Sequence, residues 1–222
     1  MTEPVDEIIR EYIDFVNRQV GAYMDALAGF EGHYTRVERQ VHRVNRPTGT
    51  RTDEKGQQVV VWASYEDPTK PDIIHNRIIR AKDYLEANSK EGSNSQQHSQ
   101  AILVFIFSFW EEEIRPRLAD SRGVDKDSIK SNIMGDLREV RHAILHAKGI
   151  IRQDKYGKLT TLKYMFEVDK PICITYENMH DIFKYIKQDC VRMMFDWLGV
   201  KDAPIKPEEM VDVAIQIRRK DP

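Results

Sequence analysis

The stretch SNIMGDLREVRHAILHAKG, residues 131 to 149, decides how we expect this chain to fold. On an α-helix of about 3.6 residues per turn, its apolar residues share one stripe, and its charged residues and histidines take the opposite side. Four residues form the stripe that we expect to face the core: Ile133, Leu137, Val140 and Ile144. The polar side carries Arg138, Glu139, His142 and His146, with Arg141 at its edge. Gly149 is a plausible end for the helix, because glycine commonly follows the last helical turn.

The polar side of this helix has two interpretations. Charged helix faces are normally solvated, and His and Lys near a helix C-terminus interact well with the helix dipole. The sharper interpretation is a functional site built from arginines and histidines that share one face.

The chain length and composition are typical of one domain, which we expect to span residues 1 to 222. Hydrophobic residues make up 41% and charged residues 32%, so a real core fits inside a well-solvated surface. The formal net charge is −2, and a case for nucleic-acid binding must therefore rest on local patches.

Cysteine usage and hydropathy indicate a soluble, cytoplasmic protein without membrane association. Cys173 and Cys190 have no CxxC spacing, which favours a reducing compartment over a disulfide framework. The longest apolar run, Ala101 to Trp110, is too short to cross a bilayer, and the charged, amphipathic N-terminus does not resemble a signal peptide.

Helical spacing recurs along most of the chain and predicts a mainly α fold, an up-down bundle of four to five helices with a small β-hairpin arm. We expect Gly32 to end the first helix and Pro116 to kink or end the apolar one. A β-branched run at 58 to 64 predicts a strand, and residues 150 to 176 suggest a small hairpin or an irregular arm. The helices are expected, besides that at 131 to 149, at 4–30, 72–88, 98–120, 177–198 and 207–220.

Arginines recur at spacings of three and four after the first helix, at Arg36, Arg39, Arg43 and Arg46. If this segment is helical, they share one face. They then either follow the phosphates of a nucleic acid or form an ordinary solvated face.

Metal sites and known nucleotide-binding loops find little support. Glu139 with His142 and Glu177 with His180 form two ExxH pairs, as in di-iron bundles, but the third helix that such a site requires is missing. His142 and His146 could hold one metal ion, yet no third ligand is evident. Neither cysteine has a nucleophile signature, and no GxSxG, GxxxxGK[ST] or GxGxxG motif occurs. We therefore predict no metal and no cofactor.

The segment RHAILH, from Arg141 to His146, resembles the R-x4-6-H motif of the HEPN superfamily. In many HEPN proteins a polar residue follows the arginine and a glycine follows the histidine soon after, as His142 and Gly149 do here. The preceding WEEEIRPRL and a short arm before the last long helix are also similar to a subset of these proteins. The resemblance spans about residues 72 to 198.

The resemblance implies a helical bundle that dimerises with its motif helices face to face. Many HEPN proteins are metal-independent ribonucleases of toxin–antitoxin, abortive-infection and CRISPR systems. Others have lost activity and bind RNA, nucleotides or proteins. By position, His146 would be the catalytic histidine, Arg141 the phosphate-binding arginine and His142 the residue that orients them.

The residue types suit this chemistry. A histidine can exchange the proton of a ribose 2′-OH near neutral pH, and an arginine can stabilise charge on the phosphorus centre. We therefore predict a homodimeric endoribonuclease of phage defence or toxin type, with an antitoxin or another defence-system protein as a candidate partner. The alternative is a non-catalytic module that binds RNA, nucleotide or protein. The residues predicted to contact the RNA backbone are Arg138, Lys148, Arg152, Arg36, Arg39 and Arg43.

Overall fold

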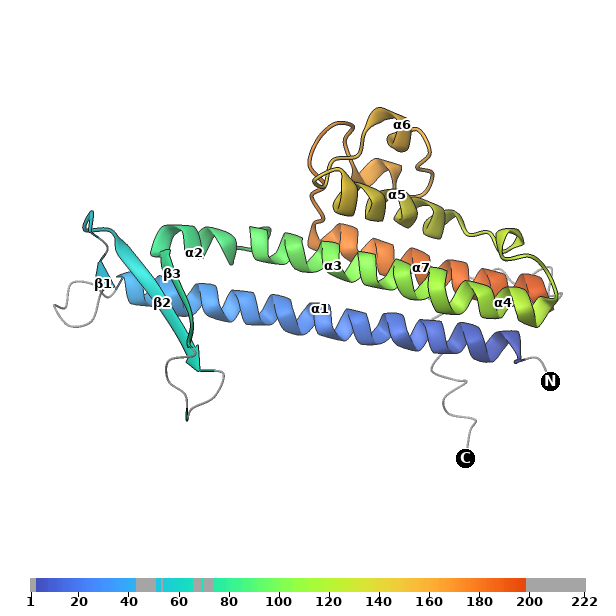
Figure 1. The fold of residues 1–222 in the computed structure, drawn as a ribbon, viewed down its shortest axis with the longest axis horizontal. Helices are drawn as coiled ribbons and strands as arrows, with labels where there is room; N and C mark the ends of the chain where they lie inside the picture. The colour runs from blue at the N-terminus through green and yellow to red at the C-terminus, as the bar shows by residue number, and fades with distance from the viewer. Residues whose placement is uncertain (1–2, 43–50, 53, 66–68, 70–73, 199–222) are drawn as a thin grey trace. The chain divides into compact units, whose positions relative to one another are not determined.

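The computed structural model describes residues 3–42, 51–52, 54–65, 69 and 74–198 (Figure 1). It confirms the predicted mainly α fold with a small β element. The chain divides into two compact units. We call Met1–Ala22 with Ser99–Pro222 the helical unit and Tyr23–His98 the sheet unit.

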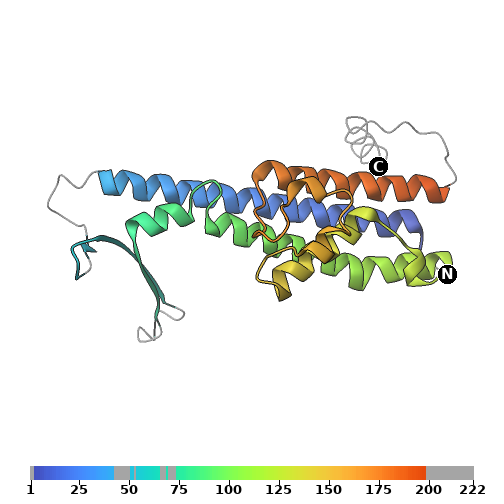
Figure 2. The same ribbon diagram turned by 90° about the horizontal axis from the view of Figure 1, so that it is seen from above.

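The helical unit is built on long helices whose apolar faces meet. The first part of α1 (Val5–His42) lies beside α4 (Arg115–Arg122) and α7 (Tyr176–Leu198), and both views show α5 (Asn132–His146) against this layer (Figures 1 and 2). Its core includes large side chains that are almost completely buried, among them Tyr12, Ile106, Leu118, Leu137 and Ile186. No helix in the described residues is both long and apolar enough to cross a membrane.

The N-terminal helix is longer than predicted. Helix α1 passes through Gly32 and continues to His42, so the expected end at Gly32 is wrong. A glycine inside a helix costs only about 1 kcal/mol relative to alanine, which packing readily outweighs. Val37, beyond the glycine, is buried and provides such packing. Arg36 and Arg39 therefore do lie on a helix.

Pro116 neither ends nor breaks the apolar helix. Helix α3 (Ser93–Phe109) continues through a π-helical turn, Trp110–Ile114, into α4. In this turn the backbone N–H of Arg115 donates to the carbonyl of Trp110, five residues back. A proline has no N–H and crowds the carbonyl four residues before it, so a wider turn directly ahead of Pro116 suits the chain.

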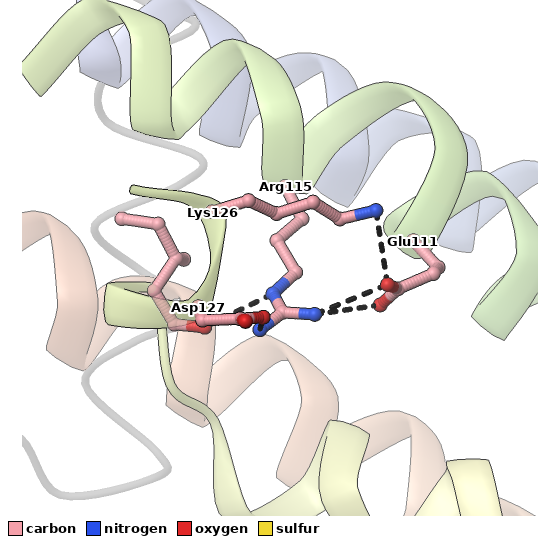
Figure 3. Close-up of polar contacts among 5 residues, drawn as sticks. Glu111, Arg115, Lys126 and Asp127 are labelled. Carbon is pink, nitrogen blue, oxygen red and sulfur yellow. Dashed lines mark hydrogen bonds and ion pairs between the residues drawn. The ribbon is translucent and has the colours of Figure 1, made fainter. Parts of the chain in front are cut away.

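The guanidinium of Arg115 holds the connection between α4 and α5 (Figure 3). The side chain is buried and donates to both carboxylate oxygens of Glu111, each at 3.1 Å, and to the Ile129 carbonyl at 3.1 Å. A further bond at 3.2 Å reaches Asp127, and Lys126 lies 3.0 Å from Glu111. Arg115 thus fixes the segment that leads into α5.

The sheet unit contains a three-stranded antiparallel sheet in the order β1 (Arg51–Thr52), β2 (Gln58–Tyr65) and β3 (Ile74–Arg80). The predicted strand at 58 to 64 is confirmed. The predicted helix at 72 to 88 is wrong in its first half, because Ile74–Arg80 pairs with β2 and α2 (Ala81–Ala87) begins only afterwards. Apolar residues four apart suit one face of a helix and one face of a strand equally, and here strand pairing prevailed.

Residues 150 to 176, which we call the arm, are irregular, one of the two forms predicted for them. The arm contains α6 (Gln153–Tyr156), a 3₁₀ turn at Lys163–Met165 and one isolated bridge between Ile150 and Pro171. The predicted helix at 207 to 220, and Arg43 and Arg46, lie outside the described residues.

Candidate active site

Helix α5 has well-defined ends. The Ser131 hydroxyl caps its N-terminus by accepting from the backbone N–H of Met134 at 3.1 Å. At the other end, the N–H groups of Ala147 and Gly149 both donate to the Ala143 carbonyl, at 3.0 and 2.9 Å. Gly149 has a φ of 74°, which suits glycine, so the predicted end at this residue is confirmed.

The predicted core stripe of α5 is buried, although it is wider than expected. Ile133, Leu137 and Val140 are buried, and Ile144 is partly buried. Met134, Asp136 and Ala143 broaden the buried face on its two sides. Six of the fifteen residues of α5 are therefore buried, and the outward-facing surface carries Arg138, His142, Leu145 and His146.

The three motif residues sit on or beside this outward surface. His142 and His146 are exposed on successive turns, with their ring centroids 5.1 Å apart. Arg141 is partly buried, and its guanidinium carbon lies 5.8 Å from the ring centroid of Phe107 on α3. Its Nε atom is buried and has no hydrogen-bond partner in the described part of the chain. The aromatic ring thus holds the arginine in place by a cation–π contact while leaving donors unused.

This arrangement can accept an anion and exchange protons beside it. Within residues 3–198 as described, no carboxylate pairs with Arg141, His142 or His146. An arginine without a carboxylate partner can bind a phosphate in a bidentate manner. The two exposed imidazoles of the same helix are groups that can act as proton donor or acceptor.

The other predicted RNA-binding residues are distributed over both units. Arg138, Lys148 and Arg152 are exposed in the helical unit, on α5 or directly after it. Arg36 and Arg39 are exposed on the part of α1 that belongs to the sheet unit, and Arg36 hydrogen-bonds His33 at 3.0 Å. Arg43 lies outside the described residues. Contact with RNA stays a prediction for all six.

Asp136 is the residue of this helix that sequence reasoning missed. Only 1% of its surface is exposed. Its carboxylate accepts hydrogen bonds from the backbone N–H of Leu162 at 2.7 Å and from the backbone N–H and hydroxyl of Thr160, at 2.9 and 3.2 Å. The signal was present, because an acid between Ile133 and Leu137 falls at the edge of the core stripe and must find donors there.

The ExxH pairs do not gather into a metal site. The Glu139 carboxylate pairs with Lys155 of the arm at 3.5 Å. Among the residues described, no three His, Cys, Asp or Glu side chains lie close enough together to hold a metal ion.

Comparison of this chain with models of known protein families, with curated proteins and with solved structures finds no match.

Proposed function

We propose that this protein is a metal-independent endoribonuclease of HEPN type that acts as a homodimer. One observation carries the proposal: exposed His142 and His146 lie on successive turns of α5, and the same helix carries Arg141, which no carboxylate neutralises in the described residues. By the HEPN resemblance, its role would lie in phage defence or as a toxin.

In the proposed reaction, His146 takes the proton from a ribose 2′-OH, and the 2′ oxygen attacks the adjacent phosphorus atom. The bond from phosphorus to the 5′ oxygen breaks, and this oxygen leaves with a proton supplied by a second imidazole. Arg141 stabilises the negative charge on the phosphate oxygens. The products are a 2′,3′-cyclic phosphate and a 5′-OH, and no metal ion is required.

The shape of the outward surface of α5 supports a dimeric site. Arg141 and His146 are five residues apart and so diverge by roughly 140° around the helix axis. A second copy facing the first would bring complementary groups from both chains to one phosphate. Leu145 is 49% exposed on this surface, and Gly135 has no side chain and open space beside it. Both features suit the close approach of another helix.

A non-catalytic module that binds RNA, nucleotide or protein is the second candidate. In the described residues neither motif histidine donates to a carboxylate or carbonyl that would fix its tautomer, as catalytic histidines commonly do. Such a surface binds anions without needing a fixed imidazole.

The test uses wild-type protein, His146→Ala and, as a matched control, His180→Ala, which removes another exposed histidine of the helical unit. Each is incubated with total RNA and labelled tRNA, in EDTA and then with Mg²⁺. We expect cleavage in EDTA with cyclic phosphate ends, unchanged in His180→Ala and about 100-fold slower or undetectable in His146→Ala.

Other outcomes contradict the proposal. RNA binding without cleavage in either buffer would favour the binding module. Cleavage that needs Mg²⁺ and ignores His146 would mean that the active residues lie elsewhere. A solution mass that stays monomeric at micromolar concentration would refute the two-chain site.

A further inference from the structure

Aromatic and basic side chains alternate along the outer surface of the arm and the start of α7. Lys163 Nζ lies 5.2 Å from the ring centroid of Tyr156. The neighbouring Tyr164 hydroxyl lies 3.2 Å from the Tyr185 hydroxyl, and Lys184 Nζ lies 5.5 Å from the Tyr185 ring centroid. We call these five residues the tyrosine–lysine row. The row draws on three KY pairs of the sequence, residues 155–156, 163–164 and 184–185.

Core packing does not account for this row. Tyr164 is 63% exposed, although its hydroxyl also donates to Asp181 at 3.2 Å. Lys163 is exposed and has no carboxylate partner in the described residues. Lys158 and Arg152 add two further exposed cations on the same arm. Among the described residues, the acid that the row contacts is Asp181, which pairs with Lys184 at 2.7 Å.

The arm holds three residues of this row, Tyr156, Lys163 and Tyr164, in a segment that is fixed to α5. Its ends are joined by backbone hydrogen bonds, from Ile172 to Gly149 at 2.7 Å and from Asp169 to Ile151 at 2.9 Å, and Asp136 fastens its middle. The ion pair between Lys155 and Glu139 sets α6 against α5. Residue 139 precedes His146 by about two turns, or roughly 10 Å along the helix axis, and lies on the same side of the helix.

We propose that the tyrosine–lysine row binds single-stranded RNA and presents it to the α5 site. Unpaired bases stack on the tyrosine rings, and the lysines contact the phosphates between them. A duplex cannot engage the row in this way, because its bases are stacked on one another. The assignment of RNA as the ligand rests on the proposed ribonuclease function.

The test measures binding separately from cleavage. All proteins carry His146→Ala, and fluorescence anisotropy in EDTA follows a labelled RNA single strand of about 12 nucleotides and the same sequence as a duplex. The row variants are Tyr164→Ala, Tyr164→Phe and Lys163→Gln. Lys82→Gln, an exposed lysine of the sheet unit, is the control for the loss of one charge.

We expect Tyr164→Ala to weaken binding of the RNA single strand about 5-fold or more, while Tyr164→Phe keeps the ring and binds like the parent. Lys163→Gln should weaken binding and reduce the slope of log K against log salt by about 0.7, whereas Lys82→Gln should change neither. The duplex should bind more weakly than the single strand and should not respond to Tyr164→Ala.

The proposal is overturned if the parent binds no RNA or if Tyr164→Ala binds the RNA single strand as tightly as the parent does. Cleavage by wild type in EDTA separates the two proposals. If wild type cleaves while row variants bind normally, the row is wrong and the ribonuclease stands. If binding depends on the row but wild type never cleaves, the row stands and the ribonuclease fails.

Discussion

Replacing Asp136 with alanine should detach the middle of the arm from α5. The Leu162 residue is fully buried, so its N–H would lose a charge-assisted bond and find no water. That bond is worth about 1.5–3 kcal/mol. Water can replace the carboxylate at Thr160, which is exposed, so its two bonds add only about 0.5–1 kcal/mol. We therefore expect a loss of about 2–4 kcal/mol in the free energy of unfolding, a large share of the 5–15 kcal/mol typical of a domain.

Urea unfolding measures the loss of stability, and native-state hydrogen exchange locates it. The Leu162 amide should exchange faster in Asp136→Ala than in wild type, and more so than amides of α7. Asp136→Asn keeps one acceptor oxygen and should lose less stability. Asp120→Ala, which removes an exposed aspartate of α4, should stay within about 0.5 kcal/mol of wild type. A loss below about 1 kcal/mol with unchanged exchange at Leu162 would show that Asp136 does not hold the arm.

Three further predictions concern other parts of the helical unit. Gly149→Ala should lower the free energy of unfolding by about 1–2 kcal/mol, because φ is 74° at this residue. Gly135→Ala should raise the free energy of unfolding by about 0.5–1 kcal/mol, because Gly135 lies inside a helix with open space around it. Urea titration compares the two variants, and equal effects would contradict the assigned helix end. Burial raises the pKa of Cys190, so a thiol reagent at neutral pH should label the exposed Cys173 in native protein and Cys190 only after unfolding; rapid labelling of both would disprove its burial. Partial burial raises the pKa of Glu111, but its basic neighbours Lys126 and Arg115 lower this pKa by more, so that the net pKa lies below the ordinary 4.5. The ionised carboxylate therefore stabilises the folded protein above about pH 4.5, and this contribution is lost as the pH falls through the lower pKa of the folded state. Wild-type stability should thus decline more steeply in acid than that of Glu111→Gln, as thermal unfolding between pH 3 and 6 would reveal, and parallel curves would argue against this pair of contacts.

The sequence predicted α5 well because its signals are local. A stripe at spacings of three and four, with a glycine after the last turn, needs no knowledge of the rest of the chain. The hydrogen-bond partners of its polar residues could not be predicted in this way, because they lie far away in the sequence. Asp136 bonds to Thr160 and Leu162, more than twenty positions away. Such donors are backbone groups of an irregular arm, and a side-chain pattern does not reveal where they will lie.

Two errors arose where one spacing fits two structures. Ile74 and Ile78 are four apart, which suits a helix and a strand alike, and only pairing with β2 decided between them. In the apolar helix, Ile106, Trp110 and Ile114 are also separated by four each time. In an α-helix such a series drifts by about 40° at every step, so repeated fours were a usable sign of a wider turn.

The π-helical turn at Trp110–Ile114 makes the number of residues in this segment depend on Pro116. The turn accommodates one more residue than a regular α-helical turn over the same rise. A homologue that has lost one residue here would close the turn to α geometry, and a proline at the position of Pro116 would then clash with the carbonyl behind it. Deletions in this turn should therefore occur together with replacement of the proline, so that a gap and a substitution are inherited as a pair.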